Sequence, residues 1–275
     1  MEERATLAGT SQDGRAMRRF WLMGGALLLT LLLGVLLAAR PADASTRIQI
    51  RCTVYTLDED GTQTPNRVDP IFSTGHLHHH FGNTTTTNDS TGESLKAANT
   101  TSCDKDWFTS AGWFPVARDP GGRFVPFERR NQVIVYYRNP GDAADLQPIP
   151  TGLGIFTNDI KIKSSGDRVT LTFPDCLNPA ALVYPDMLSP ADMRRSRQGN
   201  CPSEYSYRIP RVSYVIRYSG TITSQTEVSA GVDEWAPFRT EMHADYLAAN
   251  QDVFNNQLID QCLRFGRPGV DPACE

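Results

Sequence analysis

Four of the five histidines in the chain lie in one short segment, His76-Leu77-His78-His79-His80, and the fifth is His243. The ordinary pKa of histidine lies near neutral pH, so its side chain is suited to proton transfer and to metal ligation. If the segment is extended, His76, His78 and His80 project to one side and His79 to the other. This clustering indicates a site. The simpler alternative is a polar loop whose imidazoles hydrogen-bond to backbone and water.

Metal ligation is one chemistry that this pattern supports. Two imidazoles at the His76 and His78 spacing can chelate one ion, and His243 would complete three protein ligands to a divalent metal with one open position. Asp245 follows His243 at the same two-residue spacing. We therefore expect His76, His78, His243 and Asp245 to converge in one pocket. The alternative is that Asp245 caps a helix and that His243 packs beside it.

Acid–base chemistry is the second candidate. Asp69, Asp175 and Asp245 are the candidate catalytic carboxylates, with His78 and His243 as their partners. Cleavage of a glycosidic bond generally needs two carboxyl groups that flank the bond. We expect Asp69 and Asp175 near the rim of the pocket, because turns and strand ends are where scaffolds display chemistry. Asp69, which precedes Pro70, could alternatively do no more than open a turn.

Binding of a polysaccharide substrate would need further side chains. Trp113 and Tyr136 are candidates for stacking against sugar rings, and His76 and His79 are candidates for polar contacts to the substrate. Most aromatic side chains of a β protein belong to its core instead, so both alternatives stay open for the two rings.

The first 44 residues have the layout of a secretory signal. Arg18-Arg19 precede an uncharged run from Phe20 to Ala39, and Ala42-Asp43-Ala44 supplies a cleavage site. We expect a signal peptide over 1–44 and one secreted or extracytoplasmic domain over 45–275, with no membrane contact after cleavage. The alternative is an uncleaved anchor, since the run is long enough to span a bilayer.

Charge and cysteine content narrow the class of protein further. Residues 1–44 contain five Arg and four acidic residues, which leaves 22 basic and 27 acidic groups in the remainder. No basic patch is evident, so we do not expect a nucleic-acid partner. Six cysteines all follow residue 44, and an even count in an exported protein indicates disulfides. We expect neighbours in sequence to pair: Cys52–Cys103, Cys176–Cys201 and Cys262–Cys274.

The elements that must position these residues are mainly strands. Alternating apolar residues predict a half-buried strand over Arg47 to Leu57. Similar patterns occur at Val133–Tyr137, Ile160–Lys163, Val169–Phe173, Val212–Tyr218 and Thr221–Thr223. Ser164 to Asp167 should join two antiparallel strands in a hairpin. The fold class is therefore mainly β, an antiparallel β-sandwich or barrel-like domain stapled by disulfides.

Only the tail of the chain has a helical pattern. Apolar residues from Ala244 to Phe265 approximate a helical stripe, which Gly266 and Pro268 would end. We expect a C-terminal α-helix there, with His243 and Asp245 just before it or at its start.

Four ordered segments of the chain resemble the secreted family of unknown function DUF1996. They are Asp69-Pro70-Ile71 with Gly75 to Asn83; Phe173-Pro174-Asp175-Cys176; Cys201-Pro202 with Ile209-Pro210 and the strand to Tyr218; and His243-Ala244-Asp245-Tyr246 with Cys262. The resemblance implies secretion and a shared site rather than a particular reaction. Many relatives have histidines between the third and fourth cysteines, where this chain has none, and this puts its activity in doubt.

Two functions follow from these patterns. The first is a secreted hydrolase of cell-wall or other extracellular polysaccharide. The second is a non-catalytic wall-binding or metal-binding secreted protein. Two converging carboxylates would favour the first, and converging imidazoles at metal distance would favour the second. The sequence leaves the oligomeric state open.

Overall fold

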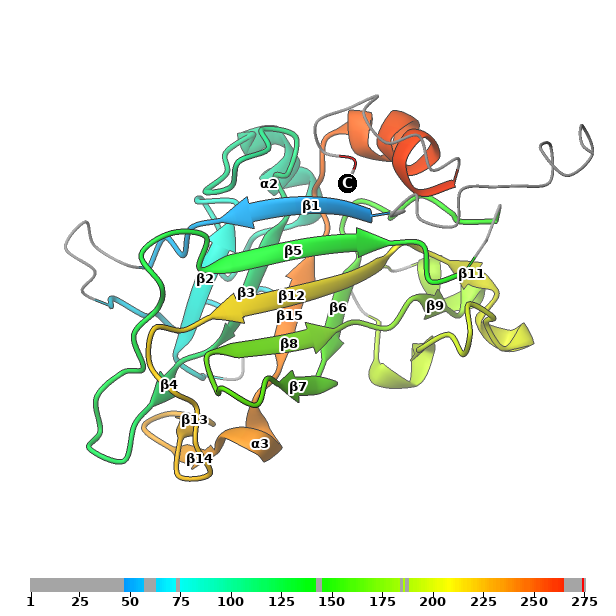
Figure 1. Ribbon diagram of the computed structural model, residues 1–275. Coiled ribbons are helices and arrows are strands. Elements are labelled where there is room, and N and C mark those ends of the chain that lie inside the picture. Colours follow the sequence, from blue (N-terminus) through cyan, green and yellow to red (C-terminus); the bar gives the residue numbers. More distant parts are fainter. Residues whose placement is uncertain are drawn as a thin grey trace, which may run out of the picture. The chain divides into compact units, whose positions relative to one another are not determined.

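The structure is a computed structural model (Figure 1), which describes residues 47–56, 63–72, 75–141, 145–183, 185, 188–264 and 274. All of them belong to one compact unit, Ser45–Glu275. The predicted signal peptide, 1–44, lies outside the described residues. No helix within the described ranges is long and apolar enough to cross a membrane.

Two antiparallel sheets make up most of the fold. The first sheet has five strands in the order β1 (Arg47–Cys52), β5 (Val133–Arg138), β12 (Arg211–Arg217), β8 (Arg168–Thr172) and β7 (Ile160–Ile162). The second sheet has four strands in the order β2 (His78–Gly82), β3 (Ala111–Pro115), β15 (Ala244–Leu247) and β6 (Gly154–Thr157). Figure 1 shows the five-stranded sheet in front of the four-stranded one.

Shorter elements complete the domain. Two three-stranded sheets contain β9 (Cys176–Leu177), β10 (Met193–Arg194), β11 (Tyr207–Arg208), β4 (Ala117–Arg118), β13 (Glu227–Ser229) and β14 (Trp235–Pro237). The helices are α2 (Gly92–Ala98), α3 (Phe238–Glu241), a C-terminal π-helix (Phe254–Arg264) and 3-10 turns at Pro179–Val183, Pro190–Asp192 and Ser203–Tyr205.

Aromatic side chains fill the space between the two large sheets. The Phe81 ring meets the Tyr214 ring edge-on, with 4.8 Å between centroids. Tyr246 lies on the same side of its sheet and shares a hydrogen bond with Tyr137 of the facing sheet. Gly112 leaves room for this packing, because a Cβ there would come within 3 Å of the Phe81 ring and of the Tyr214 hydroxyl. The interior is therefore a sheet-on-sheet core.

Most of the sequence-based fold predictions are confirmed. The fold is mainly antiparallel β, β7 and β8 pair as the expected hairpin, and all three predicted disulfides form. The segment Thr221–Thr223 is not a strand, and this prediction is wrong. An alternation over three residues is too short to specify a strand. Thr223 instead closes a turn through hydrogen bonds with Thr226.

The helical tail is confirmed only in its second half. Phe254–Arg264 is helical and buries Phe254, Leu258 and Leu263. Ala244–Leu247, which we expected to begin this helix, is instead the strand β15 between β3 and β6. All four of its residues are buried, and an apolar run this short does not distinguish strand from helix.

The disulfide between Cys52 and Cys103 should contribute more to the stability of the domain than the disulfide between Cys262 and Cys274. It closes a loop of 51 residues, whereas Cys262–Cys274 closes 12. We expect the double substitution Cys52→Ala and Cys103→Ala to lower the free energy of unfolding by about 4 kcal/mol, against about 3 kcal/mol for the Cys262 and Cys274 pair. Urea unfolding of the two variants measures the difference. A larger loss for the C-terminal pair would contradict the loop-entropy argument.

Candidate metal centre

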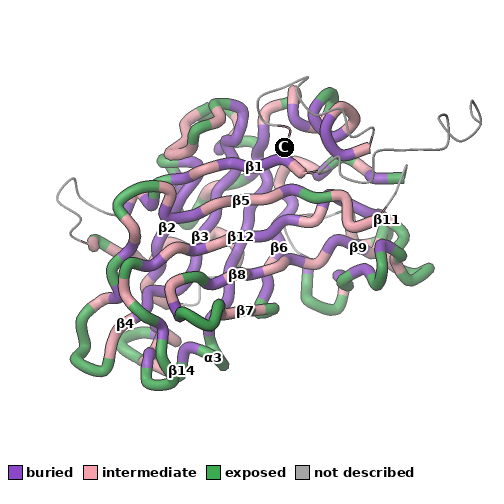
Figure 2. The backbone as a smooth tube through the Cα atoms, in the orientation of Figure 1, coloured by how far each residue is buried: buried purple, intermediate pink, exposed green. Residues whose placement is uncertain are grey.

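The side chains of strand β2 point alternately to the two faces of the four-stranded sheet. Phe81 points into the core between the sheets, where it contacts Tyr214. His78 and His80 alternate with Phe81 and therefore lie on the opposite side, here called the outer face. Figure 2 shows β2 and β3 buried along their length, so this face is covered as well.

A row of side chains crosses the outer face in register. His80 of β2 is paired with Trp113 of β3, Trp113 with Asp245 of β15, and Asp245 with Phe156 of β6. Directly paired residues of antiparallel strands present their side chains on the same side. The row thus joins one end of the histidine segment to the carboxyl group of Asp245, although the two are far apart in the sequence.

Helix α2 covers part of this face. Its N-cap Thr91 accepts a hydrogen bond from the Ser94 backbone, and the Ser94 side chain accepts one from the Thr91 backbone in return. This capping box fixes the start of the helix. Leu95 of the helix then packs into a small apolar cluster that contains Trp113. The cover excludes water from the inner end of the row.

The loop before β2 places His76. Gly75 adopts φ +74°, a left-handed conformation that favours glycine, and its carbonyl accepts a hydrogen bond from Arg67. The Leu77 backbone N–H donates to the Ser229 hydroxyl at 2.9 Å. These contacts tie the segment to the 229–233 loop and turn His76 toward His78.

His243 enters the site from the other end of the chain, between α3 and β15. Its Nδ1–H donates to the carbonyl of Glu241 at 2.8 Å. A neutral imidazole protonated at Nδ1 has its lone pair on Nε2, which is then available to a metal. A backbone carbonyl behind one ring nitrogen is a common way of orienting a histidine ligand.

The three rings converge as the sequence predicts. The centroid distances are 5.6 Å for His76–His78, 5.2 Å for His76–His243 and 6.2 Å for His78–His243. One ligand nitrogen from each ring lies within 4.8 Å of the others. We call these three residues the histidine cluster. His76 is half-buried, so the cluster is reached from the side of that ring.

Two carboxylates accompany the histidine cluster. Asp69 is buried, and its Oδ1 accepts hydrogen bonds from the backbone of Ile71 and Phe72, so the expected turn after Asp69 is also present. The charge of Asp69 acts on His80, His243 and Asp245. A carboxylate oxygen of Asp245 lies 3.8 Å from Nε2 of His243. Both acids therefore belong to the site.

Electrostatics of the site favour the uncharged forms of His78, His243 and Asp245. Burial raises the pKa of Asp245 well above its ordinary range, and the charge of Asp69 adds to the effect. Burial lowers the pKa of His243 to about 4. It also lowers the pKa of His78, to which the neighbouring His80, His243 and His76 contribute. A bound cation would reverse this preference for Asp245, because it stabilises the carboxylate.

Several buried polar atoms at this site have no hydrogen-bond partner among the described residues. They include both ring nitrogens of His78, both ring nitrogens of His80 and both carboxyl oxygens of Asp245. An unsatisfied buried polar group costs about 1–3 kcal/mol. Their concentration in one place indicates that a ligand belongs there, and the donor set of imidazole nitrogens fits a transition metal.

The remaining predicted site residues lie elsewhere. His79 points away from the cluster and is held by Thr56 at 2.9 Å and Gln63 at 2.8 Å. Asp175 is fully buried, pairs with Arg211 at 3.2 Å and accepts a hydrogen bond from the Ser196 backbone. Its contacts are thus with an arginine and a backbone N–H group rather than with the histidine cluster, and its place near the rim stays a prediction.

The two predicted sugar-stacking rings are also separated. Trp113 is fully buried beside His80, with 6.0 Å between ring centroids, and cannot stack on a substrate in this position. Tyr136 alternates with the buried Tyr137 on β5 and faces away from the core, on the far side of the five-stranded sheet. Neither ring therefore forms a platform beside the histidines.

Two residues of the site were not predicted as such. They are Phe156, which lies against His243 with 5.4 Å between ring centroids, and His80, which lies beside Trp113 at the inner end of the row. The alternation of His76, His78 and His80 was a signal for His80. The sequence has no comparable signal for Phe156, because only the pairing of β6 with β15 brings it to Asp245.

Comparison with known proteins supports the family resemblance but no reaction. The fold and the site define the protein as a mainly β domain with three disulfides and a cluster of three histidines. Residues 68–168 match the model of a family described as Domain of unknown function (DUF1996), which confirms the resemblance. The match includes Asp69 and the histidine segment, while His243 and Asp245 follow it. No curated protein and no solved structure matches the chain.

The buried histidines should make the stability of the domain depend on pH. Burial lowers the pKa of His79 in the folded state to about 3, whereas an unfolded histidine titrates near 6.5. The unfolded chain therefore takes up this proton first, and stability present above pH 6.5 is lost as the pH falls toward 3. From pH 7 to pH 5 the loss should be about 2 kcal/mol for His79 alone.

Urea unfolding in the presence of EDTA, at pH 7 and pH 5, measures this loss. The His79→Gln variant should lose about 2 kcal/mol less than the wild type over the same interval. Equal pH dependence in the two proteins would show that His79 is not held neutral.

Proposed function

We propose that this chain is a secreted metal-binding protein whose histidine cluster holds one divalent transition-metal ion. The convergence of His76, His78 and His243 from two distant segments carries the proposal. Three nitrogens bound to one tetrahedral metal at ~2 Å lie roughly 3.4 Å apart, so small rotations of the rings bring them to that spacing.

The donor set supports a borderline metal over a hard one. Imidazole nitrogens suit Zn²⁺, Cu²⁺ or Ni²⁺, whereas Ca²⁺ and Mg²⁺ prefer oxygen ligands. His243 is oriented by the Glu241 carbonyl with Nε2 toward the cluster. With three protein ligands a tetrahedral ion keeps one position open.

The surroundings support a role beyond passive metal storage. A metal in this place would act as a Lewis acid on an oxygen atom of a bound molecule. Asp69 and Asp245 stand beside the cluster as groups that can accept or hold a proton. Three disulfides support an oxidising compartment outside the cytoplasm.

Polysaccharide hydrolysis is the second candidate, and the pair of carboxyl groups favours it, on the condition that a movement at the half-buried His76 opens the buried Asp245 to substrate. Burial and Asp69 both raise the pKa of Asp245, which suits a general acid, while Asp69 supplies the companion carboxylate. Glycoside cleavage generally uses two such groups in different protonation states. This hydrolase proposal uses Asp69 and Asp245 and assigns no role to Asp175.

The metal proposal makes a stoichiometric prediction. The purified mature protein should contain about one Zn²⁺, Cu²⁺ or Ni²⁺ per chain by elemental mass spectrometry after equilibration and gel filtration. His243→Gln should weaken metal affinity by at least about 100-fold, because it removes one of three ligands and its fixed orientation. The matched control is His79→Gln, which removes a buried histidine outside the cluster.

The control should retain wild-type metal content and affinity. Loss of metal in both variants would mean that general destabilisation, not ligation, is responsible. Circular dichroism at the working temperature checks that each variant is folded.

The hydrolase candidate makes a different prediction. Release of reducing ends from cell-wall polysaccharides should fall about 100-fold or more in Asp245→Asn, the range expected for a lost general acid. Asp252→Asn, at an exposed carboxyl that pairs with Lys96, is the control and should keep full activity. Activity that persists in EDTA would favour the carboxyl pair alone. Absence of product from every polysaccharide would overturn the hydrolase while leaving the metal proposal intact.

A further inference from the structure

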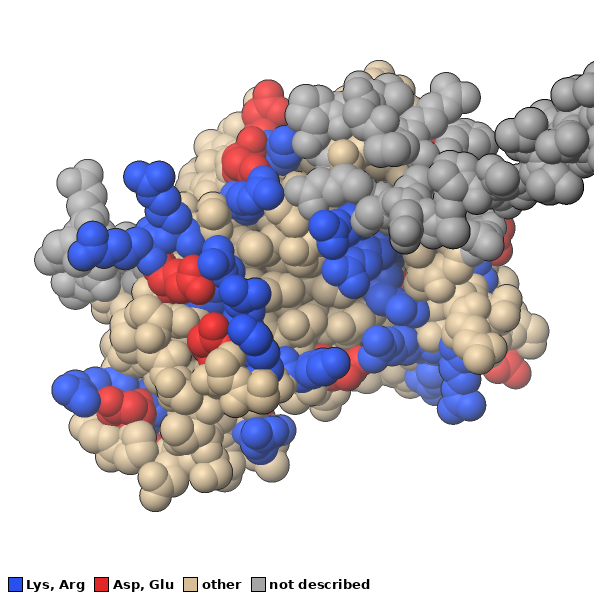
Figure 3. Space-filling view, in the orientation of Figure 1, with Lys and Arg blue, Asp and Glu red and all other residues tan. Residues whose placement is uncertain are grey.

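A second concave feature lies on the face of the five-stranded sheet that points away from the core. It is a groove of about 540 Å³. Figure 3 shows Lys and Arg side chains around a hollow on this face. We call it the basic groove. Six of its lining residues are cationic: Arg138, Lys161, Lys163, Arg168, Arg195 and Arg211.

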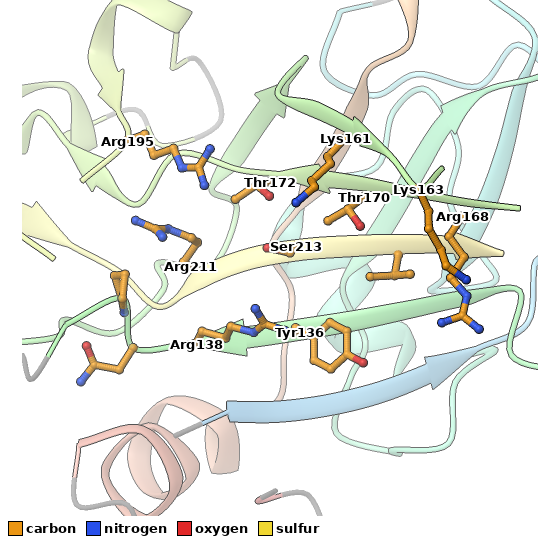
Figure 4. A pocket seen from close by; sticks show the side chains of 13 residues that line it. Tyr136, Arg138, Lys161, Lys163, Arg168, Thr170, Thr172, Arg195, Arg211 and Ser213 are labelled. Carbon is orange, nitrogen blue, oxygen red and sulfur yellow. The ribbon is translucent and has the colours of Figure 1, made fainter. Parts of the chain in front are cut away.

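The period of the strands explains how these cations come together. Residues i and i+2 of a strand face the same side, so Arg211 and Ser213 of β12, and Arg168 and Thr170 of β8, line one surface. Arg138 stands on β5, two strands from β8. In Figure 4 Arg138, Arg195 and Arg211 lie toward one end of the groove. Lys163 and Arg168 lie at the other end.

The groove is long enough for an extended ligand. It crosses from β5 over β12 and β8 to β7, and three steps between neighbouring strands span about 14 Å. It shares Thr172 and Arg195 with a neighbouring pocket of about 300 Å³, which Phe156 also lines. A single small anion would occupy only a fraction of this length.

The cations are only partly neutralised by acidic residues. Arg195 pairs with Asp159, Lys163 and Arg168 lie near Asp167, and Arg211 pairs with the buried Asp175. Arg138 and Lys161 have no ion-pair partner in the described part of the chain.

Crowding of like charges is also evident. Burial lowers the pKa of Arg138, and the nearby Arg47 and Arg211 lower it further. Each of these cations would be stabilised by an anion in the groove. None of the lining residues is acidic, so the groove itself does not supply that anion and a bound ligand would have to do so.

We propose that the basic groove binds an acidic polysaccharide, a chain with repeated carboxylate or sulfate groups. Charge complementarity along the groove favours a polyanion, and the hydroxyls of Thr170, Thr172 and Ser213 on its floor suit the hydroxyl-rich parts of sugars. A single-stranded nucleic acid is disfavoured because its bases need open aromatic faces. Tyr136 is the one aromatic lining residue, and the guanidinium groups of Arg47 and Arg138 lie over its ring at 5.5 Å and 4.8 Å from the centroid.

This groove and the histidine cluster are separate features. The groove lies on the outer side of the five-stranded sheet, and the cluster on the outer side of the four-stranded sheet. The inference therefore stands or falls independently of the metal.

Binding assays on the mature protein test the inference. The probes are polygalacturonate oligomers, dextran sulfate, neutral dextran and a single-stranded oligonucleotide with the same number of charges as the polygalacturonate. All titrations contain EDTA, so that no metal ion bridges protein and probe. We expect polygalacturonate or dextran sulfate to bind with an affinity that falls steeply with salt, and neutral dextran not to bind. Binding of one acidic probe but not the other identifies which anionic group the groove prefers.

Substitutions locate the binding. The double variant Arg138→Gln and Lys161→Gln should weaken binding of the acidic polysaccharide at least tenfold. The matched control, Arg123→Gln with Arg239→Gln, removes two exposed arginines that do not line the groove and should bind like the wild type. Circular dichroism confirms the fold of both.

Three results would overturn the proposal. They are no binding of either acidic polysaccharide by the wild type, tighter binding of the oligonucleotide, and equal weakening in the control. If the double variant does not fold, the salt dependence of wild-type binding and the comparison with neutral dextran still decide.

Discussion

The alternation of side chains along β2 is the constraint on which the site depends. The buried Phe81 must face the core, where it packs on Tyr214. Because side chains of a strand alternate, His78 and His80 are then held on the outer face. A shift of register by one residue would exchange the two sets. The core contact of Phe81 therefore fixes the direction of His78, a candidate metal ligand, and of His80.

Burial gives the site its chemical character, at a cost to the fold. Polar atoms of His78, His80 and Asp245 lie in a water-poor region without partners among the described residues. Burial lowers the pKa of His243 to about 4 and raises the pKa of Asp245 well above its ordinary range, so it favours the neutral form of each group. Neutral imidazoles are the form that binds metal, so desolvation prepares the ligands. A metal ion that gives these desolvated atoms a partner only in the folded chain would stabilise that chain.

The outer faces of the two sheets differ in burial and in charge. The outer face of the four-stranded sheet is buried and carries Asp245 beside the histidines, and the buried Asp69 lies in the loop before β2. The outer face of the five-stranded sheet is hollowed and carries cations on several strands. Arg211 of the second face pairs with the buried Asp175. One domain thus separates a candidate reaction centre from a candidate surface for an anionic polymer.

Local patterns in the sequence indicated the strands with clear alternation, the presence of disulfides and the residues of the histidine cluster. These features depend on short-range spacing or on rare residue types, which a single sequence displays. The tertiary structure decided what depends on pairing between distant strands. It made Ala244–Leu247 a strand rather than the start of a helix, and it brought Phe156 to His243. It also gathered the six cations of the basic groove, which lie between positions 138 and 211 and form no run in the sequence. The physical reason is the same in each case, because strand register and sheet packing arise from long-range contacts that local spacing does not encode.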